Sequence, residues 1–476
     1  MQRVERRPTS LFTMARRLKP HRVVVFVITV CAAWPSSAET GSILRGPYLQ
    51  MQGPDRVQVR WRTDPSVREG TVRYGTGVDE RGQSVQARRL AGSTVNWGAS
   101  LEGLHPNSKY YYSVHVKERI LVGGDKWHFF YTAPPPGARQ PIRFWVLGDA
   151  GINGYGRHHR LFGLQDRAAD GFREYNDARR IDGILLLGDN AYPSGTDQQY
   201  QLGIFEPYRK ELHSVPIWPC IGNHDTDHCY FQIFSMPIRG QIGGVASGSS
   251  EYYSFDYANV HFVVLSTWRT KFGSAGDPQI KWLRKDLESN RQDWTVVAFH
   301  HPPYCDGKYR SEDVGWAGSV RRSIVPVMEK HGVDLVLCGH DHTYQRSYLI
   351  DGHYGPSAGF NPTVHLKDQG NGSERPFRKT HGPHQGTVYV VSGTAGAPVP
   401  LKNVIRRFAH PAMIELAGGQ GAGRGIGRLG TFLLEIDGLT LSGTQISEGG
   451  KSLDHFTIEK TRRGLQSGAP GEPQPQ

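Results

Sequence analysis

Cysteine is scarce in this 476-residue chain, which contains only five. No two of them have the Cys-x-x-Cys spacing of a zinc ribbon. Cys31 lies near the N-terminus, whereas Cys220 and Cys338 stand inside apolar runs and are predicted to be buried thiols. Cys229 and Cys305 are predicted to lie in loops, where they could form a disulfide in an oxidising compartment. Four cysteines permit three pairings, and the sequence alone leaves all three open.

Long hydrophobic runs are also missing. The apolar stretch from Val23 to Ala33 is far shorter than the ~20 residues that cross a bilayer. Basic residues precede it and Ser36-Ser37-Ala38 follows it, an order typical of an export signal. A buried core helix is the alternative, which Pro35 and the polar residues after it disfavour. We therefore predict a signal peptide over residues 1–38, no stable membrane span, and an exported protein that is periplasmic or secreted.

No cluster of basic residues follows this segment. The formal net charge is +12, but residues 1–38 contribute +6, and the other +6 is spread over more than 400 residues. Proteins that bind nucleic acid concentrate Lys and Arg on one surface, so no nucleic acid partner is predicted. A hydrophobic content of 37% excludes a disordered chain and a polytopic membrane protein. The weak positive charge is compatible with a small anionic substrate, and the oligomeric state stays open.

Two kinds of local pattern follow one another along the chain. Over residues 43–132, short alternating runs such as Val57-x-Val59-x-Trp61 recur without helical periodicity, which is typical of a β-sandwich. The segment from Leu104 to Tyr110 is similar to the tyrosine corner of fibronectin type III-like domains, in which the phenol hydroxyl bonds back to the chain. Residues 133–140 begin with Ala-Pro-Pro-Pro-Gly, which predicts a stiff linker.

Residues 141–463 form the second region, in which strands alternate with helical segments. Apolar strand runs are predicted at 143–147, 184–187, 295–299 and 334–338, and helical spacing at 161–172. This alternation predicts an α/β domain. Residues 352–386 are predicted to be a polar surface loop, and residues 464–476 a disordered tail.

Five apolar runs of the second region end in residues that suit metal ions. The endings are Gly148-Asp149, Gly188-Asp189-Asn190-Ala191-Tyr192, Gly222-Asn223-His224-Asp225, Phe299-His300-His301 and Gly339-His340-Asp341-His342. Sites in α/β sheets form at the carboxyl ends of strands, so these endings can converge. Oxygen and imidazole donors without thiolate favour iron, zinc or manganese. Seven such donors are too many for one ion and suit two.

These motifs resemble those of purple acid phosphatases, within the calcineurin-like metallophosphoesterase superfamily. Most of the superfamily has Asp-x-His in its first motif, whereas this chain has Asp149-Ala150-Gly151. Tyr192 instead stands three residues after Asp189, as in the Gly-Asp-x-x-Tyr motif of purple acid phosphatases. The resemblance implies an all-β sandwich of the fibronectin type III-like kind, followed by the four-layer α/β/β/α sandwich of metallophosphoesterases.

The resemblance also implies a binuclear metal centre. Fe(III) would be held by Asp149, Asp189, Tyr192 and His342, with Asp189 bridging, and a divalent zinc, iron or manganese ion by Asn223, His300 and His340. A phenol of free pKa ~10 binds as phenolate only to a strong Lewis acid, which favours Fe(III) and predicts a charge-transfer colour.

The function implied is the hydrolysis of small phosphomonoesters, by direct attack of a hydroxide that the metals activate. His224 is the first candidate for contacting the phosphate or moving a proton, and a ligand-orienting role is its alternative. His301 is the second candidate. Plant-type enzymes carry a further His pair where this chain has Tyr304 to Arg310, so the acid that protonates the leaving group stays unassigned. Two alternatives remain: a phosphodiesterase or nucleotide hydrolase that uses Mn(II) or Zn(II), and a binding protein with an inert metal domain.

Overall fold

The computed structural model describes residues 41–92, 94–268, 276–398, 410–416 and 426–461. The predicted signal peptide and the predicted tail lie outside the described residues. Within these ranges, no helix is both long and apolar enough to cross a membrane.

The N-terminal domain is built from two antiparallel sheets, as predicted. One sheet contains β1 (Ile43–Gln50), β2 (Arg56–Thr63), β6 (Asn96–Glu102) and β5 (Arg88–Arg89), in that order. The other contains β4 (Gln83–Gln86), β3 (Thr71–Gly75), β7 (Lys109–Val116) and β8 (Arg119–Gly123), with β9 (Phe129–Tyr131) paired to β7.

Alternation along the strands explains the core of this domain. Val57, Val59 and Trp61 of β2 are all buried, because every second side chain of a strand points to the same face. The predicted tyrosine corner is confirmed: the backbone N–H of His105 donates to the Tyr110 hydroxyl at 3.0 Å. This bond ties the loop before β7 to the strand itself.

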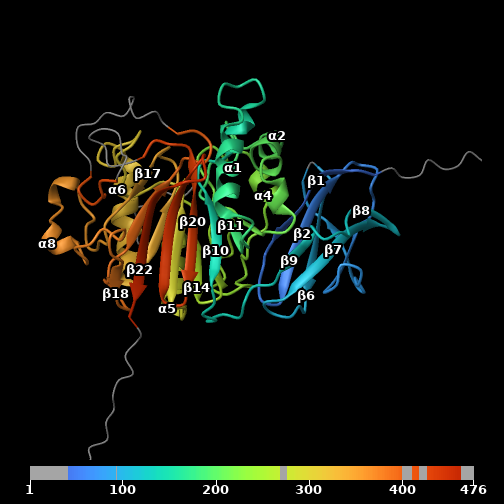
Figure 1. Ribbon diagram of the computed structural model, residues 1–476, viewed down its shortest axis with the longest axis horizontal. Coiled ribbons are helices and arrows are strands. Elements are labelled where there is room, and N and C mark those ends of the chain that lie inside the picture. The colour runs from blue at the N-terminus through green and yellow to red at the C-terminus, as the bar shows by residue number, and fades with distance from the viewer. Residues whose placement is uncertain (1–40, 93, 269–275, 399–409, 417–425, 462–476) are drawn as a thin grey trace, which may run out of the picture. The chain divides into compact units, whose positions relative to one another are not determined.

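The second domain contains two larger sheets (Figure 1). The seven-stranded sheet has the order β12 (Ile217–Trp218), β11 (Gly183–Leu186), β10 (Ile142–Leu147), β20 (Gly430–Asp437), β21 (Thr440–Ser447), β22 (Ser452–Lys460) and β18 (Phe377–Lys379). The six-stranded sheet has the order β13 (Tyr253–Tyr257), β14 (Val260–Val264), β15 (Trp294–Phe299), β16 (Leu335–Cys338), β19 (Val388–Ser392) and β17 (Tyr344–Arg346).

Helices cover the outer faces of these sheets, and the sheets pack on each other. The helical segments of the described chain are η1 (Gly151–Tyr155), α1 (Leu164–Asn176), α2 (Asp197–Tyr200), η2 (Gln201–Phe205), α3 (Arg209–Leu212), α4 (Cys229–Ile233), α5 (Pro278–Ser289), α6 (Gly315–Ser323), α7 (Val325–Lys330), η3 (Ser357–Gly359) and α8 (Pro362–His365). On β10, Phe144 meets Phe262 of the other sheet at 4.7 Å between ring centres, whereas Trp145 stacks on Phe172 of α1 at 4.1 Å. Both faces of β10 are therefore buried, as the four-layer fold requires.

Three details of the sequence interpretation differ from the structure. Cys229 and Cys305 do not form a disulfide, since all four cysteines of the described chain are free. Cys229 begins α4, whereas Cys305 is buried with its thiol directed at the carbonyl of Tyr309. Residues 352–386 are more than a surface loop, because their β18 joins the seven-stranded sheet beside β22.

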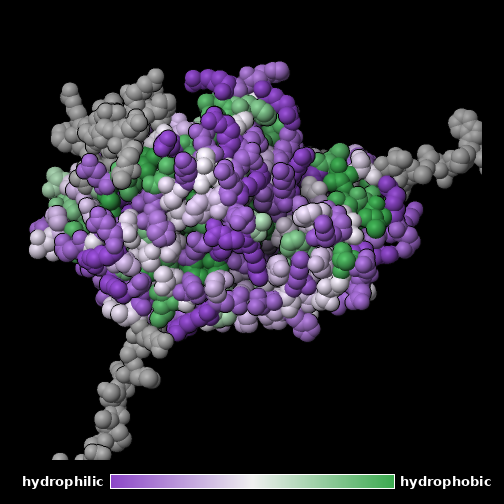
Figure 2. All heavy atoms as spheres, in the orientation of Figure 1, coloured by the Kyte–Doolittle hydropathy of each residue, from purple (hydrophilic) through white to green (hydrophobic). Residues whose placement is uncertain are grey.

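Hydrophilic residues cover most of the face drawn in Figure 2.

A buried histidine links two carboxylates in the six-stranded sheet. His261 of β14 lies 2.7 Å from Asp256 through Nδ1 and 2.9 Å from Asp286 through Nε2. Burial opposes a charge on this ring, but the hydrogen bonds to Asp256 and Asp286 outweigh burial and raise its pKa to about 9. The imidazolium is therefore the form that the fold stabilises.

We expect this histidine to make stability depend on pH. Since the folded pKa lies above the unfolded value of ~6.5, its contribution is complete below pH ~6.5 and is lost as pH rises through about 9. His261→Gln should lower the free energy of unfolding of the metal-free protein by about 3 kcal/mol at pH 6 and by clearly less at pH 9.5, measured by urea titration. His158→Gln, on an exposed side chain, is the control. An equal loss at both pH values would contradict the expectation.

Candidate metal centre

The predicted ligands stand on loops that follow the strands of both sheets. Asp149 follows β10 and Asp189 follows its parallel neighbour β11. His300 follows β15 and His340 follows its parallel neighbour β16. Asn223 is the exception, because β12 ends five residues earlier, at Trp218. The third predicted strand ending is therefore a loop rather than a strand terminus.

The chain approaches this site through strained turns. Asp149, Asp189 and His340 have φ angles of 56°, 55° and 67°, in the left-handed region that costs a non-glycine residue about 1 kcal/mol or more. Neighbouring loops also pass very close to one another: a Cβ on Gly222 would lie 2.2 Å from the backbone nitrogen of Asp189. Such strain is typical of sites where position matters more than local stability.

The first group of donor atoms surrounds the Tyr192 hydroxyl. This oxygen lies 3.0 Å from Asp189 Oδ2, 3.2 Å from Asp149 Oδ1 and 3.1 Å from His342 Nε2. With metal–ligand bonds of about 2.1 Å, adjacent donors of one ion lie about 3 Å apart. The four atoms thus have the spacing of one coordination shell.

The second group surrounds Nε2 of His300. This nitrogen lies 3.0 Å from Asn223 Oδ1, 3.2 Å from His340 Nδ1 and 3.3 Å from Asp189 Oδ1. Asp189 therefore presents one carboxylate oxygen to each group, the arrangement of a bridging ligand. The structure brings together all seven predicted donors.

The donor set fits cations. His300 Nδ1 lies 2.8 Å from the carbonyl oxygen of Leu187, which can only accept, so Nδ1 carries the proton of the neutral ring. Nε2 then directs a lone pair at Asn223 Oδ1, which carries lone pairs too. Acceptor atoms that face one another are stabilised by a positive charge between them. One such group of the described chain, Asp149, Asp189 and His300, has donor atoms that all lie within 4.8 Å of one another.

The pKa shifts agree with this demand for positive charge. Burial disfavours a charged His300, but the Asp189 carboxylate outweighs burial and raises the His300 pKa to about 9. Burial raises the pKa of the Tyr192 phenol well above its usual value, and the carboxylates of Asp189 and Asp149 raise it further. Ionising this phenol therefore requires a strong Lewis acid close to its oxygen.

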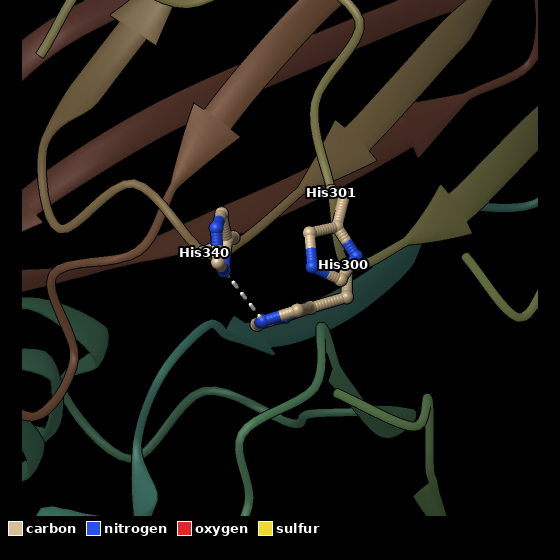
Figure 3. A group of neighbouring side chains, drawn as sticks. All are labelled: His300, His301 and His340. Atoms are coloured by element: carbon tan, nitrogen blue, oxygen red, sulfur yellow. Dashed lines mark hydrogen bonds between the residues drawn. The ribbon is translucent and has the colours of Figure 1, made fainter. Parts of the chain in front are cut away.

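His301 belongs to a second compact group, with His300 and His340 (Figure 3). One ring nitrogen of each lies within 4.8 Å of the others. His301 Nδ1 is paired with the Thr267 hydroxyl at 3.0 Å, and burial, reinforced by His300, lowers the His301 pKa to about 3. The residue does not line the cleft described below, so its catalytic role remains a prediction.

Two buried carboxylates support the loops and were not singled out from the sequence. Asp225 accepts from the backbone N–H of Asn190 at 3.1 Å and of Gly222 at 2.9 Å. Asp341 accepts from the backbone N–H of Gly307 at 3.0 Å and of Lys308 at 2.9 Å. Each stands beside predicted ligands, in Asn-His-Asp and His-Asp-His, but the sequence does not show which way its side chain points.

A cleft of about 440 Å³ opens onto both donor groups. Its lining residues are Ile152, Tyr155, His159, Arg160, Leu161, Asp189, Tyr192, Asn223, His224, Lys308, Tyr309, His340, His342, Ala397 and Pro398. In this lining, His224 Nδ1 is 2.7 Å from the carbonyl oxygen of Pro193, and Nε2 is 3.9 Å from Asp189 Oδ2; the catalytic role of His224 stays a prediction. Sequence reasoning missed the contributions of residues 155–161, which follow the first motif in an apparently ordinary loop.

Comparisons with known proteins match this architecture. Residues 45–132 match the N-terminal domain of purple acid phosphatases, and residues 142–344 match the calcineurin-like phosphoesterase domain. Purple acid phosphatase 18 of Arabidopsis thaliana is 25% identical over 333 residues, which cover 67% of this chain and 69% of the relative. Purple acid phosphatase 21 of the same plant is 28% identical over 320 residues, which cover 63% and 65%.

The chain thus spans about two thirds of the length of these relatives. A solved structure of a purple acid phosphatase from yellow lupin (Lupinus luteus) seeds shares the fold, with a TM-score of 0.62, 20% identity, and 88% of this chain and 74% of that chain covered. The chain thus contains a calcineurin-like phosphoesterase domain preceded by a purple acid phosphatase N-terminal domain, an arrangement that indicates a metal-dependent phosphoric ester hydrolase.

Proposed function

We propose that this protein is an exported phosphatase with a binuclear metal centre, which hydrolyses small phosphomonoesters. The observation that carries the proposal is the position of Asp189, whose two oxygens face two separate groups of donor atoms. The names of the plant relatives, purple acid phosphatases, support the same activity. The proposal of export rests on the sequence of residues 1–38.

The donor atoms suggest which ion each group holds. Asp149, Tyr192 and His342 would hold Fe(III) with Asp189, because only a strong Lewis acid ionises the buried phenol. Asn223, His300 and His340 would hold a zinc, iron or manganese ion. When bound, two such ions supply Lewis acidity toward the phosphate oxygens and lower the pKa of water.

The protein's own groups position the ester. His224 has one nitrogen fixed by the Pro193 carbonyl and the other free to face the cleft, so it can contact a phosphate oxygen or exchange a proton there. Asp341 and Asp225 hold the loops that carry the donors, through backbone N–H groups. No side chain is required to form a covalent phosphoenzyme.

Metal content tests the bridging role of Asp189. We expect the full chain to retain two ions after purification in iron and zinc, and Asp189→Asn to retain one or none, because both groups lose an anionic donor. Activity should fall by about 100-fold or more. Asp170→Asn, a surface carboxylate on α1, is the control and should keep both ions. Two ions in the Asp189→Asn variant would contradict the bridge.

Colour tests the assignment of Tyr192. A phenolate bound to Fe(III) gives a broad visible absorption band, which Tyr192→Phe should abolish while the fold, measured by circular dichroism, is kept. A colourless wild-type enzyme that is active with Mn(II) or Zn(II) would instead support the phosphodiesterase or nucleotide hydrolase. A panel of mono- and diesters then separates the activities, with monoesters expected to react faster.

His224→Gln separates the two roles considered for this histidine. If the ring contacts the ester or transfers a proton, kcat should fall by about 10²-fold or more while the metal content stays unchanged. If it only orients ligands, the metal content should fall together with activity. Steady-state kinetics and metal analysis of one preparation decide between them.

A further inference from the structure

Two cations in the cleft have no carboxylate partner. Lys308 and Arg160 are both exposed and line the cleft. Among the residues that the structure describes, neither forms an ion pair within 4 Å of a carboxylate, and the single carboxylate lining the cleft is the predicted ligand Asp189. Arg157, on the same loop as Arg160, is by contrast paired with Glu206 at 2.7 Å and does not line this cleft.

Lys308 is held in place by the metal-binding segment itself. Its backbone N–H donates to Asp341, which stands between the predicted ligands His340 and His342. The preceding Gly307 donates to the same carboxylate, and a Cβ on it would lie 2.4 Å from Asp341 Oδ1. The backbone of this turn therefore packs directly against the segment that carries His340 and His342.

The Lys308 ammonium lies over the ring of Tyr309. Its Nζ is 4.8 Å from the centre of the Tyr309 ring, and that ring stacks on His340 at 4.7 Å with an angle of 9°. On the other loop, Tyr155 stacks on Tyr192 at 5.6 Å and on His159 at 4.5 Å. Tyr155 is 39% exposed, which is unusual for a large aromatic side chain in this structure. Each of the two loops thus brings one tyrosine ring and one cation to the cleft.

The cleft also has room for more than the reacting phosphate. Its volume of about 440 Å³ falls within the range of small-molecule sites, about 300–1,000 Å³. The phosphate must lie at the donor atoms, so the remaining space accommodates the group that leaves.

We propose that Lys308 and Arg160, with Tyr155 and Tyr309, form a leaving-group subsite that selects phosphomonoesters whose leaving group carries a planar ring and a negative charge of its own. This inference rests on the proposed phosphatase function and assigns specificity to residues outside the metal centre. The tyrosines contact the ring, and the two unpaired cations attract its charge.

Two phosphonates that differ by one carboxylate group test the subsite without turnover. Phenylphosphonate and 3-carboxyphenylphosphonate are titrated calorimetrically into the metal-loaded full chain. We expect the carboxylated compound to bind more tightly, and Lys308→Met to reduce that preference by about threefold to fivefold, the effect of one exposed ion pair. Lys308→Met/Arg160→Met should abolish it. Lys308→Arg, which keeps the charge, and the matched control Arg157→Met should retain it.

Each result either supports or overturns the subsite. If Lys308→Met weakens the binding of both phosphonates equally, Lys308 contacts the phosphoryl group and the proposal is overturned. A wild-type protein that binds both phosphonates equally well would also overturn it. Hydrolysis of phenyl phosphate and 3-carboxyphenyl phosphate by the same preparations separates this test from that of the function. A protein that prefers the carboxylated phosphonate but hydrolyses neither ester refutes the phosphatase function alone. A protein that hydrolyses the esters but shows no preference between the phosphonates refutes the subsite alone.

Discussion

Lone pairs that face one another around the Asp189 carboxylate are the constraint on which the site depends. His300 Nε2 lies 3.0 Å from Asn223 Oδ1 and 3.3 Å from Asp189 Oδ1, and it carries no proton when the ring of His300 is neutral and its Nδ1 is bonded to Leu187. Such a cluster is unfavourable without positive charge. The Asp189 carboxylate raises the His300 pKa to about 9, so that in the absence of a metal a proton on this ring supplies the positive charge.

The fold supplies the rigidity that this cluster requires. Strands β10 and β15 are buried along their length, and their side chains pack against a second sheet and against helices. Loops at the ends of such strands can hold residues in left-handed backbone conformations, as at Asp149 and His340, because the strands on either side do not relax. Asp225 and Asp341 add bonds from buried carboxylates to backbone N–H groups. Burial raises the pKa values of Asp225 and Asp341, so keeping these two carboxylates charged costs free energy.

The lining of the cleft has two parts, the predicted metal donors and the residues of two neighbouring loops. The donors come from the ends of strands, where the fold leaves little freedom, whereas Tyr155 and Lys308 come from loops that can change length and sequence without disturbing the sheets. The Asp341 carboxylate connects the two parts, since it stands between two donors and holds the backbone of Lys308. One buried side chain thus links the loop of Lys308 to the segment that carries His340 and His342.

The sequence by itself predicted the class of both domains and the seven side chains that the structure brings together, because alternation, Gly-Asp and His-x-His spacings are local properties of the chain. It also identified Tyr110 as a corner residue, which the bond from His105 confirms. Other features depend on contacts between distant segments. The sequence suggested a Cys229–Cys305 disulfide, which the fold separates, and a plain loop at 352–386, which the fold uses as a sheet edge. The roles of Asp225, Asp341 and Lys308 were decided only by tertiary structure, because a side chain's direction is set by the loops packed around it and not by its own neighbours in the chain.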